Sequence, residues 1–564
     1  MQEQKKPNYL KGAAILAAAS VFVKVIGAVY KIPIFNILGD EGTGYFQVTY
    51  NVYTLILTIA TAGIPVALSR LVSSAAAKGE SGLVRRYFSV ALPAFVIIGL
   101  IAMLVMFFFA DAFAGLMNNA AAAHGIRVLA PAVLFVCIIS VYRGYAQGFE
   151  YMIPTAASQV VEVVCKAAFG IAAAMWLMNL EFDLSIVSAG AITGVTVGLG
   201  LCIPLLIRYK RKIDRGAFFS VAPSETVGLY ESERSPETGG SPEAETPGKA
   251  RVFGRLMNVS IPITIGASFM TIMTVIDTSI VLGRLQNALD ATESEASTLF
   301  GVYTKGLTIY NLPPALIVPI AVSIIPAIAA ALAKRRSDEA GVIMQSSVKL
   351  VNLLAMPAGA GIMVLAGPIL TALYHDLRQT PETVALMTTM LVILGAASFF
   401  VCLQHVTTAI LQATGHERIA LMTFPVGAVL KIAISYFLAG NPAFGIIASP
   451  VGTLACFVLI SALNIIFIFI IVKEKPKFGA VFAKPLFCTA MMAAAAYFVY
   501  KLTSLLGSGL IGSGRFAVSV FLAISIAVAV ALYAVLIIIT RTITLDDMKL
   551  VPKGEIIARK LRIR

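Results

Sequence analysis

Several ionisable side chains fall inside long apolar stretches of this sequence, where a charge is costly. A charged group at the centre of a membrane helix costs about 2.5–3.5 kcal/mol on insertion scales, so it normally faces protein or water. Most of these groups are lysines, and lysine and arginine are common donors to phosphate oxygens. The excess of cations therefore predicts a cavity that accommodates an anion, most naturally a phosphate-bearing one. The residues are Lys24, Lys31, Glu162, Lys166, Asp277, Lys305, Lys349 and Lys431.

Two of these lysines, Lys24 and Lys431, lie deepest in their segments and have no acidic residue one helical turn away. We expect them to line the cavity, with inert ion pairing as the alternative. Lys31, Lys305 and Lys349 lie within about two turns of predicted helix ends. Lysines so placed can extend their ammonium groups to the interface, and for Lys349 we favour that interpretation.

The two acidic residues can pair with cations or take part in ion coupling. Glu162 precedes Lys166 by four residues, the favourable order for an ion pair on one helix. That pairing and a substrate role for Lys166 are both open. Asp277 could bind a coupling cation, but pairing with a lysine of a neighbouring helix is favoured. Arg143 is predicted to face the inner half of the cavity or the membrane interface. The predicted substrate-binding residues are Lys24, Lys31, Arg143, Lys166, Lys305 and Lys431.

Membrane-spanning helices must position these residues. Of the 564 residues, 59% are hydrophobic and 13% are charged. The apolar stretches are roughly 20 residues or longer, enough to cross a bilayer as helices, and they lack the alternation of a β-barrel strand. We predict an all-α integral membrane protein of about fourteen transmembrane helices. The segments lie near 10–33, 45–70, 87–110, 126–148, 155–178, 185–207, 257–283, 299–330, 346–371, 384–412, 417–439, 443–472, 482–505 and 514–540.

The chain repeats itself at a fixed spacing. Phe135-Val136-Cys137 recurs as Phe400-Val401-Cys402, and Lys166 recurs as Lys431, both 265 residues later. Ile64–Ser69 is echoed by Val318–Ser323 at an offset of 254. Such repeats predict two homologous six-helix halves, as in many transporters. The predicted domains are an N-lobe (1–208), a flexible cytoplasmic linker rich in Ser, Glu, Pro, Thr and Gly (209–256), a C-lobe (257–472), an extra helix pair (473–540) and a basic cytoplasmic tail (541–564).

The distribution of charge predicts the orientation in the membrane. Most of the 43 Lys and Arg fall in the loops of one side, while the opposite turns are neutral or acidic, as at Asp40-Glu41. This asymmetry places both termini in the cytoplasm. The net charge of +14 is thus explained by topology, and no nucleic-acid partner is expected.

Proline and glycine punctuate the second segment of each half. Proline removes a helical hydrogen bond and bends the helix, which membrane helices tolerate where neighbours satisfy the freed groups. These residues could act as hinges, or they could be fixed kinks that aid packing. The predicted hinge residues are Gly63, Pro65, Pro313, Pro314 and Pro319.

No signature of enzymatic chemistry is present. We find no phosphate-binding glycine loop, no dinucleotide fingerprint, no metal-binding histidine pair and no nucleophile elbow in a plausible context. All six cysteines lie in apolar segments without metal-ligand spacing. We expect no enzymatic activity, no cofactor and no metal.

Three stretches resemble a known family: Lys11–Pro33, Leu38–Gln47 and Thr61–Val72. They are similar to the stage V sporulation protein B and MurJ-like branch of the multidrug/oligosaccharidyl-lipid/polysaccharide flippase superfamily. That resemblance implies two six-helix lobes in a V around a central cavity, plus an extra helix pair. It also implies outward movement of the undecaprenyl-diphosphate-linked peptidoglycan precursor, lipid II.

The resemblance extends to individual residues. Lys24 and Lys31 fall where the better-known flippases carry cavity-lining arginines. The stretch Thr304–Pro313 departs from the pattern, because the better-known branch has an acidic and arginine cluster there. Lys305 could substitute for it.

These observations predict a flippase of the bacterial cytoplasmic membrane. It would pass a polyprenyl-diphosphate-linked saccharide through a cationic cavity by alternating access, as a monomer, with cell-wall synthesis proteins as possible partners. One alternative is a Na⁺- or H⁺-coupled multidrug antiporter of the same superfamily, although buried carboxylates are few. Another is a non-transporting scaffold for envelope or sporulation proteins.

Overall fold

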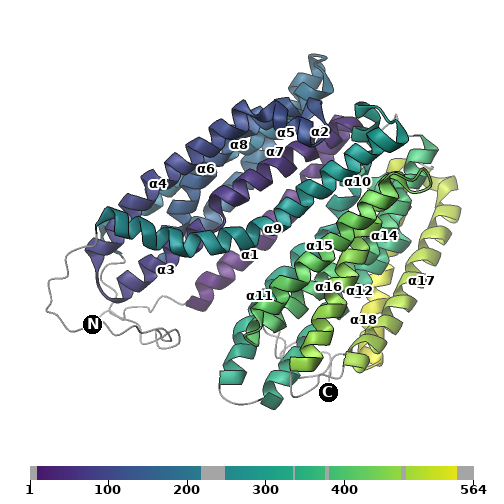
Figure 1. Ribbon diagram of the computed structural model, residues 1–564. Helices are drawn as coiled ribbons and strands as arrows, with labels where there is room; N and C mark the ends of the chain where they lie inside the picture. Colours follow the sequence, from purple (N-terminus) through teal and green to yellow (C-terminus); the bar gives the residue numbers. More distant parts are fainter. Residues whose placement is uncertain are drawn as a thin grey trace. The chain divides into compact units, whose positions relative to one another are not determined.

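The protein is a chain of long helices joined by short turns, and its computed structural model contains no strand among the residues described (Figure 1). These residues are 9–217, 248–333, 337–374, 380–471, 478–512 and 514–542. Most of the predicted linker and nearly all of the predicted basic tail lie outside them. The predicted all-α class is confirmed.

Twelve helical stretches in the described part of the chain are long and apolar enough to cross a membrane. They cover thirteen of the fourteen predicted segments, because the first two lie in one continuous stretch, Ala19–Ala77. The predicted segment near 299–330 consists of two helices, α10 (Glu293–Tyr310) and α11 (Leu312–Ala333). Neither helix is among the twelve long apolar stretches. The chain is a multi-pass membrane protein.

By packing, the chain forms two compact units. Unit 1 comprises Met1–Gly27 and Val48–Val275, and unit 2 comprises Ala28–Gln47 and Ile276–Arg564. The chain passes between the units three times, near the end of α1 (Tyr9–Val29) and inside α2 (Lys31–Thr61) and α9 (Lys249–Leu289). The units therefore differ from the sequence halves, since each includes a helical segment from the other half. The lobe boundaries 1–208 and 257–472 stay a prediction.

Unit 1 packs its helices around a core of small and branched apolar residues. That core includes Leu68, Val72, Phe95 and Tyr145. Besides parts of α2 and α9, its helices are α1 (Tyr9–Val29), α3 (Ile64–Ala77), α4 (Ser81–Phe108), α5 (Ala110–Leu116), α6 (Ala123–Gly148), α7 (Ile153–Asn179) and α8 (Leu184–Lys212).

Unit 2 contains the remaining helices, and its cores join the last helix pair to α12. Besides α10, α11 and parts of α2 and α9, its helices are α12 (Ser337–Val364), α13 (Ala366–Leu373), α14 (Pro381–Ala413), α15 (Glu417–Ala439), α16 (Ala448–Ile471), α17 (Phe478–Ile511) and α18 (Arg515–Ile539).

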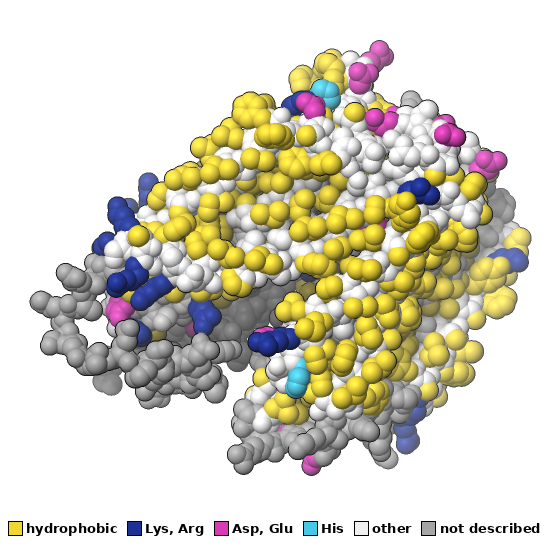
Figure 2. All heavy atoms as spheres, in the orientation of Figure 1, with side chains coloured by type: hydrophobic (Ala, Val, Ile, Leu, Met, Phe, Trp, Pro, Cys, Tyr) yellow, Lys and Arg dark blue, Asp and Glu magenta, His cyan; other side chains and the backbone are white. Residues whose placement is uncertain are grey.

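Hydrophobic side chains cover the sides of the helices on the face shown in Figure 2. Over unit 1, Lys and Arg gather at the end where α3 meets α4, as the sequence places Lys78, Arg85 and Arg86 there. This distribution suits helices whose sides meet lipid and whose ends meet headgroups.

The internal repeat is visible in the helix boundaries. The starts of α7 and α15 are 264 residues apart, as are the starts of α8 and α16, and the ends of α6 and α14 are 265 apart. In each unit the three helices pack on one another. Lys166 and Lys431 therefore occupy equivalent levels of equivalent helices.

The predicted bends are interruptions between helices. A turn at Ala62–Gly63 separates α2 from α3, and Pro65 stands in the first turn of α3. A turn at Asn311 separates α10 from α11, which begins Leu312-Pro313-Pro314. Thr264 of α9 accepts a hydrogen bond from the Gly63 amide at 3.1 Å. A neighbouring helix thus satisfies a backbone group that the interruption leaves free.

Two glycines bring α2 and α10 into backbone contact within unit 2. A Cβ on Gly301 would lie 1.7 Å from the carbonyl oxygen of Asp40, and one on Gly44 would lie 2.1 Å from that of Ser297. Thr292 and Glu295 form a capping box at the start of α10, and hydrogen bonds from Thr292 lower the pKa of Glu295. The cap and the glycines fix the start of α10 against α2.

Replacing Gly301 with alanine should destabilise the protein by about 1–3 kcal/mol, because the new methyl group meets backbone that cannot rotate away. The matched control is Gly361→Ala in α12, where a Cβ has no neighbour within 4 Å. That variant should be neutral or gain up to about 1 kcal/mol of helix propensity. Thermal unfolding in detergent measures both. Equal midpoints for the two variants would contradict the close packing.

Candidate functional site

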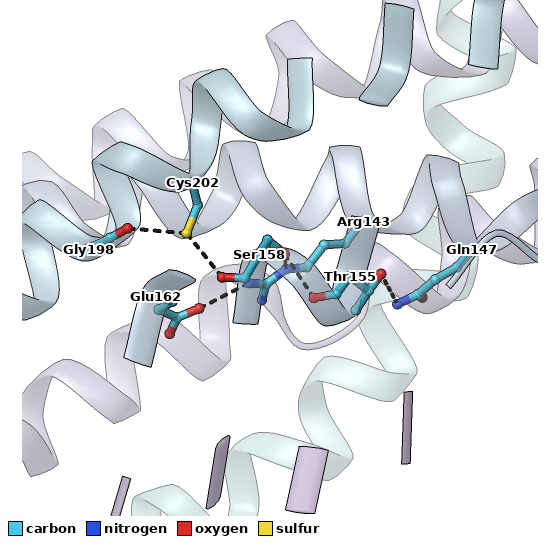
Figure 3. A network of polar contacts seen from close by, with 7 residues as sticks. All are labelled: Arg143, Gln147, Thr155, Ser158, Glu162, Gly198 and Cys202. Carbon is cyan, nitrogen blue, oxygen red and sulfur yellow. Dashed lines mark hydrogen bonds and ion pairs between the residues drawn. The ribbon is translucent and has the colours of Figure 1, made fainter. Parts of the chain in front are cut away.

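Unit 1 holds a polar network between α6, α7 and α8 (Figure 3). Arg143 of α6 points toward α7, where its Nε donates to Ser158 Oγ at 2.8 Å and its Nη2 contacts Glu162 Oε2 at 3.0 Å. Cys202 of α8 donates to the Ser158 carbonyl at 3.2 Å. Glu162, which the sequence allowed to pair with Lys166 on its own helix, thus pairs across helices with Arg143.

Lys166 lies beside an aromatic ring of the same unit. Its ammonium group is 4.9 Å from the centroid of the Tyr50 ring and 3.5 Å from the Tyr50 hydroxyl. A ring face attracts a cation without cancelling its charge. Lys166 is half-buried at the middle of α7.

Lys24 is exposed near the C-terminal end of α1, and the described part of the chain offers it no ion-pair partner. The cavity-lining role of Lys24 stays a prediction. The alternative, inert pairing, finds no support among the described residues.

Unit 2 holds a largely buried ion pair between its α2 segment and α10. The ammonium group of Lys305 contacts Asp40 Oδ1 at 2.5 Å, and the two side chains are 0% and 10% exposed. The sequence placed Asp40 in an outer turn. Two helical parts of α2 meet at a non-helical Gly39 (φ 68°), so the chain does bend directly before Asp40, but the Asp40 side chain is largely buried against Lys305. The Gly301 contact brings the two helices close enough for the pair to form.

Tyr374 completes this cluster from the end of α13. Its ring centroid is 5.5 Å from the Lys305 ammonium group, and its hydroxyl donates to the Lys305 carbonyl at 3.3 Å. The preceding carbonyl, of Leu373, accepts hydrogen bonds from Asn36 at 2.9 Å and Arg515 at 3.1 Å. The last helix therefore anchors the segment that carries Tyr374.

A second buried pair in unit 2 joins α9 to α15. Lys431 Nζ lies 2.9 Å from Asp277 Oδ2, and Ser435 Oγ donates to Asp277 Oδ1 at 2.6 Å. Both carboxylate oxygens are thus engaged. For Asp277 this is the favoured interpretation made above. For Lys431 we expected a cavity-lining role, and the structure instead shows the alternative, an ion pair with a carboxylate.

Two further lysines predicted to lie in apolar segments, Lys31 and Lys349, belong to unit 2. Lys31 lies 5.9 Å from the centroid of the Phe35 ring in unit 2, and Lys349 is half-buried on α12. Within the described residues, no group of His, Cys, Asp and Glu could hold a metal ion.

Sequence reasoning missed Asp40, Tyr374, Ser435 and Arg515. Asp40 was visible as an acidic residue close to an apolar stretch, but nothing in the sequence linked it to Lys305, 265 positions away. Hydroxyl and aromatic partners carry no signal of their own, because most serines and tyrosines in membrane helices serve packing.

Replacing Asp277 with asparagine should cost about 3 kcal/mol, because it leaves the ammonium group of Lys431 buried without a counter-charge. The double variant Asp277→Leu with Lys431→Met removes both charges and should recover most of that stability. Unfolding midpoints in detergent measure each. If Asp277→Asn were as stable as the original chain, the two charges would not be energetically coupled.

The chain is similar to proteins of known family. The polysaccharide biosynthesis protein family matches residues 9–332, and the MatE family matches residues 262–437. The lipid II flippase MurJ of Bacillus subtilis (strain 168) is 26% identical over 439 residues, which cover 76% of each chain. Stage V sporulation protein B of the same organism is 24% identical over 466 residues, covering 81% of this chain and 83% of that protein.

Solved structures share the fold. A structure of the lipid II flippase MurJ in an inward closed conformation matches with a TM-score of 0.66 at 14% identity, covering 93% of this chain and 98% of that one. An inward-facing multidrug resistance transporter of the MATE family matches with a TM-score of 0.60, also at 14% identity, over 81% of this chain and 98% of that one.

These relatives are flippases and transporters rather than enzymes, and the family match extends over more than half of the sequence. The chain belongs to the polysaccharide biosynthesis protein family, and within the multidrug/oligosaccharidyl-lipid/polysaccharide flippase superfamily it is a membrane transporter or flippase similar to MurJ and stage V sporulation protein B.

Proposed function

We propose that the protein moves a polyprenyl-diphosphate-linked saccharide, similar to lipid II, from the inner to the outer leaflet of the bacterial cytoplasmic membrane. The headgroup would cross between the lobes by alternating access while the polyprenyl tail stays in lipid. Similarity to the lipid II flippase MurJ over three quarters of both chains supports this substrate class. We also propose that both termini are cytoplasmic and that the protein acts as a monomer.

The observation that carries the proposal is Lys24, an exposed lysine in a span and without an ion-pair partner among the residues described. An uncompensated cation in an apolar helix is costly unless water or an anionic ligand meets it. The diphosphate of the substrate class supplies that negative charge. Lys31 and Lys166, whose described contacts above are with aromatic rings, would add donors for it.

The carboxylate-paired cations would serve a different step. Arg143, Lys305 and Lys431 are each neutralised in this conformation, so a diphosphate would have to replace a carboxylate to bind them. We propose that these pairs open and close as the lobes move, with Glu162 and Asp277 as the exchanging partners of Arg143 and Lys431. The helix interruptions at Gly63 and Asn311, with Pro65, Pro313, Pro314 and Pro319 beside them, would supply the hinges.

A multidrug antiporter is the second candidate, favoured by the MatE match and by the fold shared with MATE transporters. Cationic drugs and coupling ions need available carboxylates inside the membrane. Glu162 and Asp277 are both engaged by cations of this chain. That engagement makes the lipid-linked anion the better supported substrate. A non-transporting scaffold would have no need of an unpaired Lys24.

The substrate proposal predicts that the chain restores growth of a strain depleted of its lipid II flippase, and that Lys24→Ala does not. The alanine removes the charge that meets the diphosphate, while Lys24→Arg keeps it and should restore growth. Accessibility of the precursor on the outer face is the measurement, scored beside protein level in the membrane.

The matched control is Lys349→Ala, which removes another lysine from an apolar span and should still restore growth. Full precursor exposure with Lys24→Ala would defeat the role of this lysine. Failure of the well-expressed original chain would point to another lipid-linked substrate or to the scaffold.

The antiporter alternative predicts efflux of cationic dyes from a host that lacks its own pumps. We expect no efflux above that of the empty host, because Glu162 and Asp277, like Asp40, are each engaged by a cation of this chain. The assay compares dye retention with and without a Na⁺ or proton gradient. Gradient-dependent efflux that Asp277→Asn abolishes would instead favour the antiporter.

A further inference from the structure

Arg284 is an arginine of unit 2 that the transport proposal does not use. It lies near the C-terminal end of α9, half-buried, with its guanidinium carbon 4.7 Å from the centroid of the Tyr436 ring on α15. A Cβ on Gly440 would lie 2.2 Å from Arg284 Nη2. The missing side chain at position 440 thus leaves the space that the guanidinium group fills. Tyr436 and Gly440, one helical turn apart on α15, thus both border the guanidinium group and limit its movement.

The guanidinium group has unused hydrogen-bonding capacity. Its Nε is buried and has no hydrogen-bond partner, and the described part of the chain provides no carboxylate to pair with it. Arg143, Lys305 and Lys431 each have one. Gly440 caps the C-terminus of α15, whose dipole offers only about half a negative charge. The Arg284 guanidinium group therefore keeps a full positive charge, and N–H groups that can still donate, at the C-terminal end of α15.

The surroundings indicate which kind of anion can reach it. Tyr436 is 47% exposed, Phe437 73% and Phe444 40%, so the end of α15 presents aromatic rings outward. Aromatic side chains at the ends of membrane helices lie at the level of the lipid headgroups. The planar fork of a guanidinium group matches two oxygens of a phosphate.

We propose that Arg284, seated between Tyr436 and Gly440, binds the phosphate group of a membrane lipid headgroup. The Tyr436 ring and the space at Gly440 orient the guanidinium group, and the phosphate oxygens accept hydrogen bonds from its N–H groups. The site is independent of the proposed substrate and of the residues assigned to its transport. Its ligand is any lipid with an accessible phosphate in that leaflet, rather than one particular headgroup.

Native mass spectrometry of the full chain in detergent tests the site, with phosphatidylglycerol as the probe. Arg284→Gln should weaken binding of the first lipid about tenfold, the loss expected for one charge-assisted pair of hydrogen bonds. Gly440→Ala should weaken it similarly although the arginine remains, because the new methyl group displaces the guanidinium group. Arg284→Lys should also bind weakly, since it keeps the charge and loses the fork.

The controls separate this site from general attraction. Arg418→Gln removes an exposed arginine from the other end of the same helix and should change binding less than twofold. Diacylglycerol, which has the tails without the phosphate, should not compete. Equal lipid affinity in the Arg284→Gln and Arg418→Gln variants would overturn the proposal, as would displacement of the lipid by millimolar inorganic phosphate, which would identify free phosphate as the ligand.

Discussion

A charge inside an apolar helix bundle must meet an opposite charge, a polar group or water, and this requirement organises both units of the protein. Arg143 with Glu162, Lys305 with Asp40 and Lys431 with Asp277 each join two different helices. Removing one member of such a pair is far more costly than removing both. The pairs therefore specify which helices lie together at least as much as they stabilise the fold.

Close helix packing makes these pairs geometrically possible. Gly301 lets α10 approach the backbone of α2 beside Asp40, and Gly194 does the same for α8 against α7 beside Lys166. Without a Cβ at these positions the helix axes come closer, which is how membrane helices gain dispersion contacts in the absence of a hydrophobic driving force. The small residues thus set the distances that the charged residues need.

The same pairs suit a transporter, because each cation can have two defined partners. It can contact its own carboxylate, or it can contact an anionic ligand that replaces the carboxylate. A ligand shifts such an equilibrium only by its differential affinity for the two states. The diphosphate of the proposed substrate would have that difference if it took the place of a carboxylate beside a cation. Moving charge across the membrane also involves about 2.3 kcal/mol per charge per 100 mV, so the membrane potential can add to the driving force.

The sequence alone predicted the all-helical membrane fold and the twofold repeat, because hydrophobic run length and residue spacing are properties of the chain itself. It also predicted bends near Gly63 and Pro313, since proline acts locally, and the structure has helix interruptions there. It placed Lys166 and Lys431 at equivalent positions, which the helix boundaries confirm.

The choice of partners was decided only by the tertiary structure. Glu162 had a lysine four residues away, yet it contacts Arg143 of another helix. Asp40 directly follows the break at Gly39, where the sequence placed a turn, yet its side chain is largely buried against Lys305. A charge selects its partner by distance and by burial, and both depend on how helices pack. That packing rests on contacts such as Gly301 against Asp40, which join residues far apart in the chain and leave no local pattern.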